Sequence, residues 1–358
     1  LDQLKKLGCS CDWSRTRFTM DKDLSKAVIK VFVDLYNDKL IYKDKKLVNW
    51  DTNLQTAISD LEVVQKEVQS HLYYINYQLE NSDVKITIAT TRPETMMGDT
   101  AIAVNPKDKR YTNLIGKIVT IPIVNRKIKI IADHYADPDQ GSGAVKITPA
   151  HDFNDYEVGK RNKLETINIL EKDGKINKNG IKEYIGLDRI EARKLLISKL
   201  KENGSLVKIE SIKNKVPYGD RSNTIIEPLL TEQWFVDAKK LSKKPIKIVN
   251  KGKTSFFPKN WTKTFFQWMK DIEPWCISRQ IWWGHRIPAW YDNNNNLFVA
   301  ENKTEALNQA RKKNNNKECI LRQETDVLDT WFSSALWPFA TLGWPVKTSE
   351  LKRFYPTS

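Results

Sequence analysis

Residues 141–156 read GSGAVKITPAHDFNDY, an apolar run that follows two glycines and ends in polar side chains. The run predicts a strand, on which Lys146 and Thr148 point to the same side because successive side chains alternate between faces. Asp152 and Asp155 follow three residues apart, close enough to share one side of a turn or helix start. A carboxylate at a helix N-terminus is stabilised as the anion. Either aspartate is therefore a candidate partner for a substrate ammonium group, or simply a helix cap.

A second polar run follows another predicted strand. Residues 84–89 alternate apolar and polar side chains, which is typical of a half-buried strand. The next six residues read TTRPET. The hydroxyls of Thr90 and Thr91 and the guanidinium of Arg92 offer hydrogen bonds that suit a phosphate or a ribose. The alternative interpretation is a strand cap followed by an ordinary surface arginine.

Composition limits the class of protein. The 358 residues are enough for about two domains. The net charge of +15 indicates either a polyanionic partner, nucleic acid before membrane, or a lysine-rich proteome. The four cysteines form no C-x-x-C pair, so we predict no zinc site and a reducing, cytoplasmic compartment. No membrane-spanning run or signal peptide is visible, and the start at Leu1 suggests a fragment of something longer.

Three zones follow one another along the chain. Residues 21–42 carry apolar side chains at three- and four-residue steps, which predicts a helix. A β-rich middle follows, and from about Val216 the chain is rich in tryptophan. Further expected elements are strands at 118–124, 128–132 and 144–148, a helix at 188–203 that starts with Asp188 and Glu191 and stops at Gly204, and loop tips at 293–296 and 314–316.

The two polar runs resemble sequence boxes of the valyl-tRNA synthetases, a family of class I aminoacyl-tRNA synthetases. Residues 90–95 match the T-x-R-P-E-T box in the editing domain of valyl, isoleucyl and leucyl enzymes. Residues 141–156 match the G-[TS]-G-A-V-K-I-T-P-A-H-D-x-N-D-Y box of the valyl enzymes. The two boxes at this separation make the resemblance highly specific.

The resemblance implies roles in hydrolysis of a wrongly attached amino acid. Asp155 would bind the α-amino group of the aminoacyl ester, and Asp152 is suited to recognise a threonine hydroxyl. The other residues implied in this editing pocket are Lys146 and Thr148 along its wall, and Thr90, Thr91 and Arg92 by the ester and terminal ribose. A valine pocket rejects threonine only roughly a hundredfold, a limit known from the valyl enzymes themselves. We expect a positioned water, helped by a tRNA hydroxyl, because no Ser-His-Asp or zinc arrangement is visible.

Flanking segments resemble the catalytic core of the same enzymes. They are residues 11–21, 47–63, 275–290 and 326–338. The resemblance implies that Trp283 and Trp331 line a valine side-chain pocket and that His285 lies near the adenylate. Without it, a tryptophan-rich core would be the favoured interpretation. Thr52 stands where relatives usually carry proline, which loosens a turn.

The implied fold is α/β: a class I nucleotide-binding parallel-sheet core interrupted by a β-rich, barrel-like editing domain. We expect core residues at 1–63, the editing domain at 64–215 and a return to the core at 216–358. The full-length enzyme would use ATP, with Mg²⁺, to form valyl-adenylate and charge the tRNA for valine. It is expected to be a monomer without membrane contact.

Two signatures of class I synthetases, H-I-G-H and K-M-S-K-S, are absent from these residues. Both stabilise the ATP phosphates, so we expect the isolated chain to edit but not to activate valine. The alternatives are an isoleucyl- or leucyl-type relative and a stand-alone tRNA-editing module. The run Asn49-Trp50-Asp51 and residues 326–338 favour the valyl type, and the tryptophan-rich return has no use in a free editing module.

Overall fold

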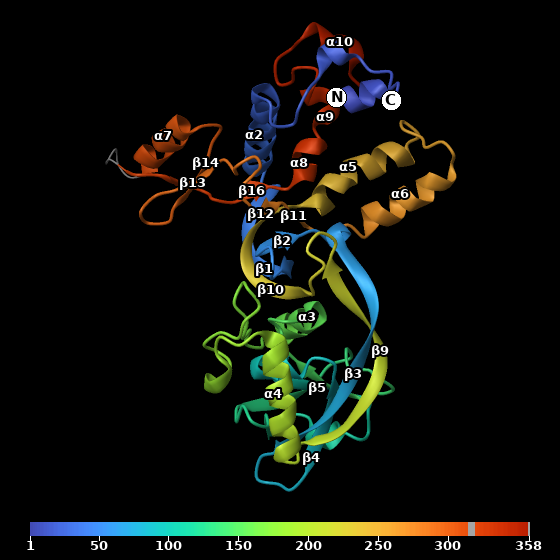
Figure 1. Cartoon of the computed structure of the whole chain (residues 1–358), viewed down its shortest axis with the longest axis vertical. Coiled ribbons are helices and arrows are strands. Elements are labelled where there is room, and N and C mark those ends of the chain that lie inside the picture. Colours follow the sequence, from blue (N-terminus) through green and yellow to red (C-terminus); the bar gives the residue numbers. More distant parts are fainter. Residues whose placement is uncertain (314–318, 357–358) are drawn as a thin grey trace. The chain divides into compact units, whose positions relative to one another are not determined.

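Two compact units make up the chain. The structure is a computed structural model that describes residues 1–313 and 319–356 (Figure 1). The insertion unit comprises Lys45–Glu232, and the core unit comprises Leu1–Asp44 with Gln233–Ser358. The loop tip predicted at 314–316 lies outside the described residues.

Seven strands form one sheet in the insertion unit. They are β3 (Val63–Leu79), β4 (Lys85–Thr90), β5 (Ala101–Val104), β6 (Ile118–Thr120), β7 (Lys127–Ala132), β8 (Ala144–Ile147) and β9 (Leu206–Gly219). Their order is β4-β3-β6-β7-β5-β8, with β9 paired to β3. Neighbours run antiparallel except β5 and β7, which are parallel. Because β4 and β8 at the two ends of this order contact each other, the sheet is a nearly closed barrel.

Helices α3 (Phe153–Asn162) and α4 (Arg189–Glu202) pack against this sheet. Strand β5 reads AIAV and is buried along its whole length. Its two large side chains join the main core with Leu196 of α4, whereas its two alanines pack in a second cluster with Val158 of α3. Because small and large residues alternate, β5 packs against other residues on both of its faces.

Shorter elements complete the insertion unit. They are β2 (Thr56–Ile58) and the 3-10 helices η2 (Asp60–Glu62), η3 (Pro93–Gly98), η4 (Thr112–Leu114) and η5 (Lys182–Tyr184). Strands β1 (Ile41–Asp51) and β10 (Ile226–Val236) carry the chain between the units. β1 pairs antiparallel with β2, with Asn49 opposite Ile58.

The core unit is a helix-rich region with short strands. Its helices are α1 (Asp2–Lys6), η1 (Trp13–Arg15), α2 (Lys22–Asn37), α5 (Ala238–Asn250), α6 (Asn260–Lys270), α7 (Lys303–Lys313), α8 (Thr330–Ser334), α9 (Trp337–Ala340) and α10 (Ser349–Phe354). Its strands are β11 (Trp275–Cys276), β12 (Ser278–Arg279), β13 (Ala289–Tyr291), β14 (Leu297–Val299), β15 (Arg322–Gln323) and β16 (Val327–Leu328). Phe32 of α2 packs edge-on against Trp234, with ring centroids 5.4 Å apart. Within the described residues, no helix combines the length and hydrophobicity that crossing a membrane requires.

Most of the predicted elements are present, several of them with shorter bounds. The helix predicted at 21–42 is α2, and the helix predicted at 188–203 is α4, where Asp188 accepts a hydrogen bond from the backbone N–H of Ile190. The strand predicted at 118–124 ends at Thr120, because Pro122 cannot donate to a neighbour and Ile123 has a positive φ of 68°. The chain turns there instead of continuing.

The mixed α/β class and the barrel-like insertion are confirmed by this structure. The strand pairs of the core unit that have a defined register in the described residues are antiparallel, and the parallel pairs expected of a nucleotide-binding core are not among them. The predicted domain boundaries near 64 and 215 fall at the start of β3 and within β9. These two strands pair with each other along most of their length.

Replacing Ile88 with alanine is expected to destabilise the insertion unit. Ile88 is fully buried in the main core of the barrel, and deletion of such a side chain costs about 2–5 kcal/mol through lost burial and the cavity left behind. Urea unfolding followed by circular dichroism measures the change. The matched control is Ile209→Ala on β9, where the side chain is 47% exposed, and its effect should stay within about 0.5 kcal/mol. Equal losses for both variants would contradict the assigned core.

Candidate functional site

Lys146 of β8 lies in a buried hydrogen-bond network inside the barrel. Its Nζ lies 2.7 Å from Thr95 Oγ1, 2.5 Å from Thr148 Oγ1 and 3.2 Å from Asp99 Oδ1. Thr148 Oγ1 donates to the same Asp99 oxygen at 2.7 Å, and the Tyr77 hydroxyl donates to the other oxygen at 2.6 Å. Lys146 and Thr148 therefore point the same way, as predicted. All three donors of the ammonium group have protein partners, so Lys146 mainly holds its neighbours in place.

Burial dominates the electrostatics of this network. It raises the pKa of the Asp99 carboxyl, although the Lys146 ammonium and the hydrogen bonds from Tyr77 and Thr148 act to lower it. A buried ion pair of this kind is strongly destabilised when one partner is removed, because the other charge remains without compensation. Each of Asp99 and Lys146 is therefore stable in its buried position only while the other is present.

Asp155 lies in the first turn of α3, directly beside this network. Its side chain is 5% exposed, and Oδ2 accepts a hydrogen bond of 2.9 Å from the backbone N–H of Thr148. Burial raises the pKa of Asp155 to about 7, and the nearby carboxylate of Asp152 adds to the rise, while Lys146 opposes it. The Asp155 carboxyl therefore keeps its proton to a higher pH than an exposed aspartate does.

Asp152 occupies the N-cap of α3 and is exposed. Its Oδ1 accepts hydrogen bonds from the backbone N–H groups of Asn154 at 2.8 Å and Asp155 at 3.0 Å. The capping role considered from the sequence is thus present. The same contact links Asp152 to Asp155, so the position of each carboxylate is set by α3.

Arg92 lies at the centre of a second charged network. Its Nε is 3.3 Å from Glu94 Oε1, its NH1 donates to the His151 carbonyl at 3.0 Å, and its NH2 forms an ion pair with Glu227. Although burial opposes it, the carboxylates of Glu227 and Glu94 raise the pKa of Arg92. The guanidinium therefore connects the end of β4 to the loop before α3 and to β10.

Two arginines of α4 complete this network. Arg193 Nε and NH2 bind Glu94 at 2.7 Å and 2.8 Å, and Arg189 Nε binds Glu227 Oε1 at 2.7 Å. Burial would raise the pKa of Glu94, but Arg193 and then Arg92 hold it below its usual value. Bidentate contacts of this kind fix geometry as well as charge. Arg189 also pairs with Asp188 at 3.5 Å, so three guanidinium groups face three carboxylates.

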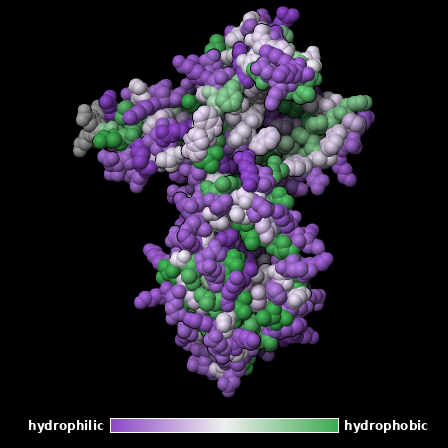
Figure 2. All heavy atoms as spheres, in the orientation of Figure 1, coloured by the Kyte–Doolittle hydropathy of each residue, from purple (hydrophilic) through white to green (hydrophobic). Residues whose placement is uncertain are grey.

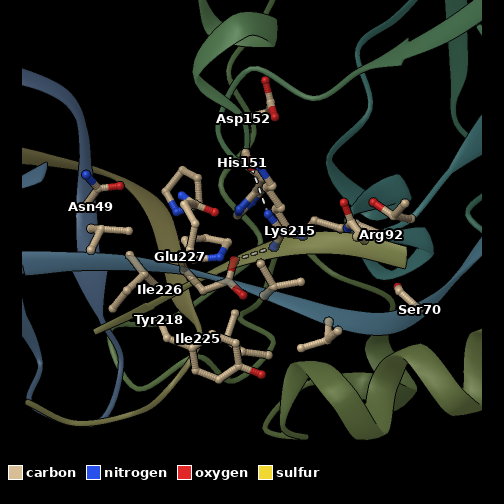
Figure 3. Close-up of a pocket in the computed structure, with 18 of the residues that line it drawn as sticks. Asn49, Ser70, Arg92, His151, Asp152, Lys215, Tyr218, Ile225, Ile226 and Glu227 are labelled. Atoms are coloured by element: carbon tan, nitrogen blue, oxygen red, sulfur yellow. Dashed lines mark hydrogen bonds and ion pairs between the residues drawn. The ribbon is translucent and has the colours of Figure 1, made fainter. Parts of the chain in front are cut away.

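The Arg92 network borders a cavity of about 870 Å³ within the insertion unit. Figure 3 shows Arg92, His151, Asp152 and Glu227 in its lining, with the contacts of Arg92 to His151 and Glu227 as dashed lines. The paired strands β3 and β9 contribute much of the remaining wall. Of the predicted editing residues, Thr91, Arg92 and Asp152 line the cavity, whereas Thr90, Lys146, Thr148 and Asp155 lie outside its lining.

Thr90 and His151 have defined local roles. Thr90 Oγ1 accepts a hydrogen bond of 3.0 Å from the backbone N–H of Arg92. His151 is 1% exposed, and its Nε2 accepts a hydrogen bond from the Ile169 N–H at 3.0 Å, so the proton of the neutral ring lies on Nδ1. Burial and then the charges of Arg92 and Lys146 hold the pKa of His151 well below its ordinary value. A histidine whose only acceptor nitrogen is occupied is a poor general base.

The predicted synthetic-site residues lie in the core unit. β12 pairs with β16, and the Leu328 N–H donates to the His285 carbonyl at 2.8 Å, so the segments 275–290 and 326–338 lie side by side. Trp283 and Trp331 are 58% and 63% exposed, and burial lowers the pKa of His285. The structure thus brings the two tryptophan-bearing segments together and leaves both rings accessible.

Several residues of the site were not predicted from the sequence. Glu94 stands in the TTRPET run and Asp99 shortly after it, and this closeness in sequence was the signal that could have found them. Arg189, Arg193 and Glu227 lie about 100 or more residues farther along the chain, and no spacing linked them to it. Within residues 1–313 and 319–356, no group of three or more His, Cys, Asp or Glu side chains is placed to hold a metal ion.

Replacing Asp155 with asparagine is expected to stabilise the insertion unit above pH 7. The folded-state pKa of about 7 lies above the ordinary 3.8, so the folded state binds more protons between these values and the wild type loses stability as pH rises through 7. Three pKa units correspond to a maximum of about 4 kcal/mol. Thermal unfolding at pH 5 and pH 8 measures this: the advantage of Asp155→Asn should grow with pH. The exposed control Glu157→Gln should show no such growth, and a pH-independent difference for Asp155→Asn would contradict the burial of its charge.

Comparison with known proteins identifies the family. The chain matches the family model described as tRNA synthetases class I (I, L, M and V) over residues 1–358. Proteins named Valine--tRNA ligase are 69% identical in Pelagibacter ubique (strain HTCC1062) over 100% of this chain and 41% of that protein, and 56% identical in Legionella pneumophila (strain Lens) over 99% and 38%. The chain thus spans about two fifths of the length of such relatives.

A solved structure gives a further, weaker comparison. The ternary complex of Agrobacterium radiobacter K84 agnB2 LeuRS, tRNA and LeuAMS is 18% identical, with a TM-score of 0.34 over 95% of this chain and 46% of that chain. The class I synthetase family expected from residues 90–95 and 141–156 is confirmed by the family model, which covers the whole chain. The chain belongs to the class I tRNA synthetases of the I, L, M and V group.

Proposed function

We propose that this chain is the part of a valine–tRNA ligase that hydrolyses threonine wrongly attached to the tRNA for valine, together with part of the valine-activating core. The names of the relatives, 69% and 56% identical, support the valine assignment. The two boxes at 90–95 and 141–156 support editing, and the proposed editing domain is residues 64–215.

The observation that carries the editing proposal is the environment of Asp155. A carboxyl that is nearly buried, next to the carboxylate of Asp152, is under electrostatic stress when ionised. A substrate ammonium group relieves that stress and forms a charge-assisted hydrogen bond. The α-amino group of an aminoacyl ester is a cation of this kind, and the Thr148 N–H holds the carboxyl in one orientation for it.

Asp152 is the proposed selectivity residue. Its carboxylate is exposed and lines the cavity, and its second oxygen is not used by the helix cap. A threonine hydroxyl donates a hydrogen bond to such an oxygen, whereas valine has a methyl group there and would leave the acceptor desolvated without a partner. The site would therefore hydrolyse threonyl-tRNA and spare valyl-tRNA.

The remaining editing residues are proposed to hold the site in shape. Lys146 and Thr148 fix the wall next to Asp155, and Thr90 fixes the backbone of Arg92. Thr91 lines the cavity, and its hydroxyl would bind a ribose or ester oxygen. In the proposed hydrolysis, a water oxygen attacks the ester carbonyl, the bond to the ribose oxygen breaks, and the water proton passes to that oxygen with help from a tRNA hydroxyl.

The whole protein is proposed to form valyl-adenylate from valine and ATP and to transfer valine to its tRNA. Trp283 and Trp331 would border the valine side chain and His285 the adenylate. The described residues offer no cluster that fits Mg²⁺, so no step is assigned to a metal here. A cytoplasmic monomer with the tRNA for valine as partner belongs to the same proposal.

Deacylation of threonyl-tRNA for valine tests the proposal. The wild-type chain is expected to hydrolyse it and to spare valyl-tRNA. Asp155→Asn should reduce kcat/KM roughly ten- to a hundredfold, because a charge-assisted contact is worth about 1.5–3 kcal/mol. The matched control is Glu157→Gln, which removes an exposed carboxylate from the same helix and should leave the rate unchanged.

Two results count against the proposal. If Asp155→Asn hydrolyses threonyl-tRNA at the wild-type rate, the amino-binding role of Asp155 is wrong. If the wild-type chain hydrolyses both substrates equally, selectivity does not lie in this pocket. Repeating the assay with the full-length protein separates an incorrect assignment from the inability of this chain to present the acceptor end.

A further inference from the structure

The helical hairpin α5–α6 in the core unit concentrates positive charge. Residues 238–270 contain no Asp or Glu, against a surplus of 15 positive charges for the whole chain. The ten lysines of this segment are all exposed: Lys239, Lys240, Lys243, Lys244, Lys247, Lys251, Lys253, Lys259, Lys263 and Lys270. A short segment therefore carries most of the excess charge, and a lysine-rich composition spread evenly over the chain does not explain it.

Most lysines of the hairpin have no ion-pair partner among the described residues. Lys240 forms an ion pair of 2.9 Å with Asp237, and no other lysine of the hairpin has an ion pair among the residues that the structure describes. Lys239, Lys243, Lys247 and Lys251 recur every four residues, which places them along one face of α5 and its C-cap. Like charges at this spacing destabilise a helix. A bound polyanion would remove that repulsion.

Exposed aromatic side chains accompany the lysines. Phe257 is 98% exposed, and Trp261 and Trp268, two turns apart on α6, are 53% and 61% exposed. The hairpin is held by other aromatic residues, since the rings of Phe256 and Phe265 lie 5.1 Å apart. Figure 2 shows hydrophilic residues next to apolar ones on the visible face of the core unit. Lysines next to free aromatic rings are typical of surfaces that bind RNA phosphates and stack on unpaired bases.

We propose that the α5–α6 hairpin is an RNA-binding surface that contacts the phosphate backbone of the tRNA. This inference rests on the proposed function for the identity of the RNA. The lysine face from Lys239 to Lys251 is roughly 18 Å long at the rise of an α-helix. It covers roughly five phosphates of one strand. Trp261 and Trp268 supply stacking for bases that are not paired.

Salt-dependent binding of the tRNA for valine by the full chain tests this surface. The variant Lys243→Gln/Lys247→Gln/Lys251→Gln removes three charges from the hairpin. The matched control Lys303→Gln/Arg311→Gln/Lys312→Gln removes three exposed charges from α7 of the same unit. Fluorescence anisotropy between 50 and 200 mM salt is expected to show a slope of log K against log salt that falls by about two to three in the hairpin variant. Affinity at low salt should fall at least roughly tenfold, and the control should stay within about twofold.

Each other outcome overturns the inference. Wild-type affinity and slope in the hairpin variant, or equal losses in both variants, would mean that the hairpin is not a specific surface. If the wild-type chain sediments with vesicles of phosphatidylserine and phosphatidylcholine and the hairpin variant does not, while the variant still binds tRNA, the surface binds a membrane instead. A wild-type chain that binds no tRNA also contradicts it.

Turnover separates this inference from the editing proposal. In deacylation of threonyl-tRNA, the hairpin variant is expected to raise KM with kcat unchanged, because the three lysines are not among the residues that line the cavity. Asp155→Asn should instead lower hydrolysis while tRNA affinity stays at the wild-type value. Hairpin-dependent tRNA binding without any hydrolysis, by this chain and by the full-length protein, would reject editing and retain the RNA surface.

Discussion

The buried ion pair between Lys146 and Asp99 is the contact on which the rest of the insertion unit depends. It joins β8 to the end of η3, and Tyr77 of β3 donates to the same carboxylate. Thr148 belongs to this network through its hydroxyl and holds Asp155 through its backbone N–H. Removing one partner would leave a buried charge unpaired, at about 3–5 kcal/mol. The network therefore fixes both the closure of the barrel and the position of the Asp155 carboxylate, which is the candidate substrate-binding group.

The two charged networks have different roles in the site. The Asp99 network is buried and satisfied internally, so it supports the wall. The network of Arg92, Glu94 and Glu227 borders the cavity and connects β4, the loop before α3 and β10. Because Arg92 NH1 holds the His151 carbonyl, it positions the residue next to Asp152. Arg92 thus shapes the loop that carries the carboxylates, in addition to any contact with a ribose.

Sequence reasoning found the elements whose two sides differ in exposure. Ile86 and Ile88 of β4 are buried and alternate with polar neighbours, and α2 has one apolar face, so periodicity predicted both. β3 and β9 were missed as long strands, since residues 63–74 of β3 and 206–218 of β9 include no buried residue and many polar ones. The site was located by two local sequence boxes. Glu227 and Arg189 were missed because only the fold brings them to Arg92.

Binding of a non-hydrolysable threonyl-adenosine amide tests the central claim, that Asp155 holds the substrate amino group as a carboxylate. Calorimetry of the full chain at pH 6.5 in buffers of different ionisation enthalpy measures affinity and proton exchange together. The account predicts binding at least roughly tenfold tighter than for the valyl amide, with net proton release as Asp155 ionises against the ammonium group. It also predicts that Asp155→Asn loses both the affinity and the proton release. Equal affinity and proton exchange in wild type and Asp155→Asn would contradict the account.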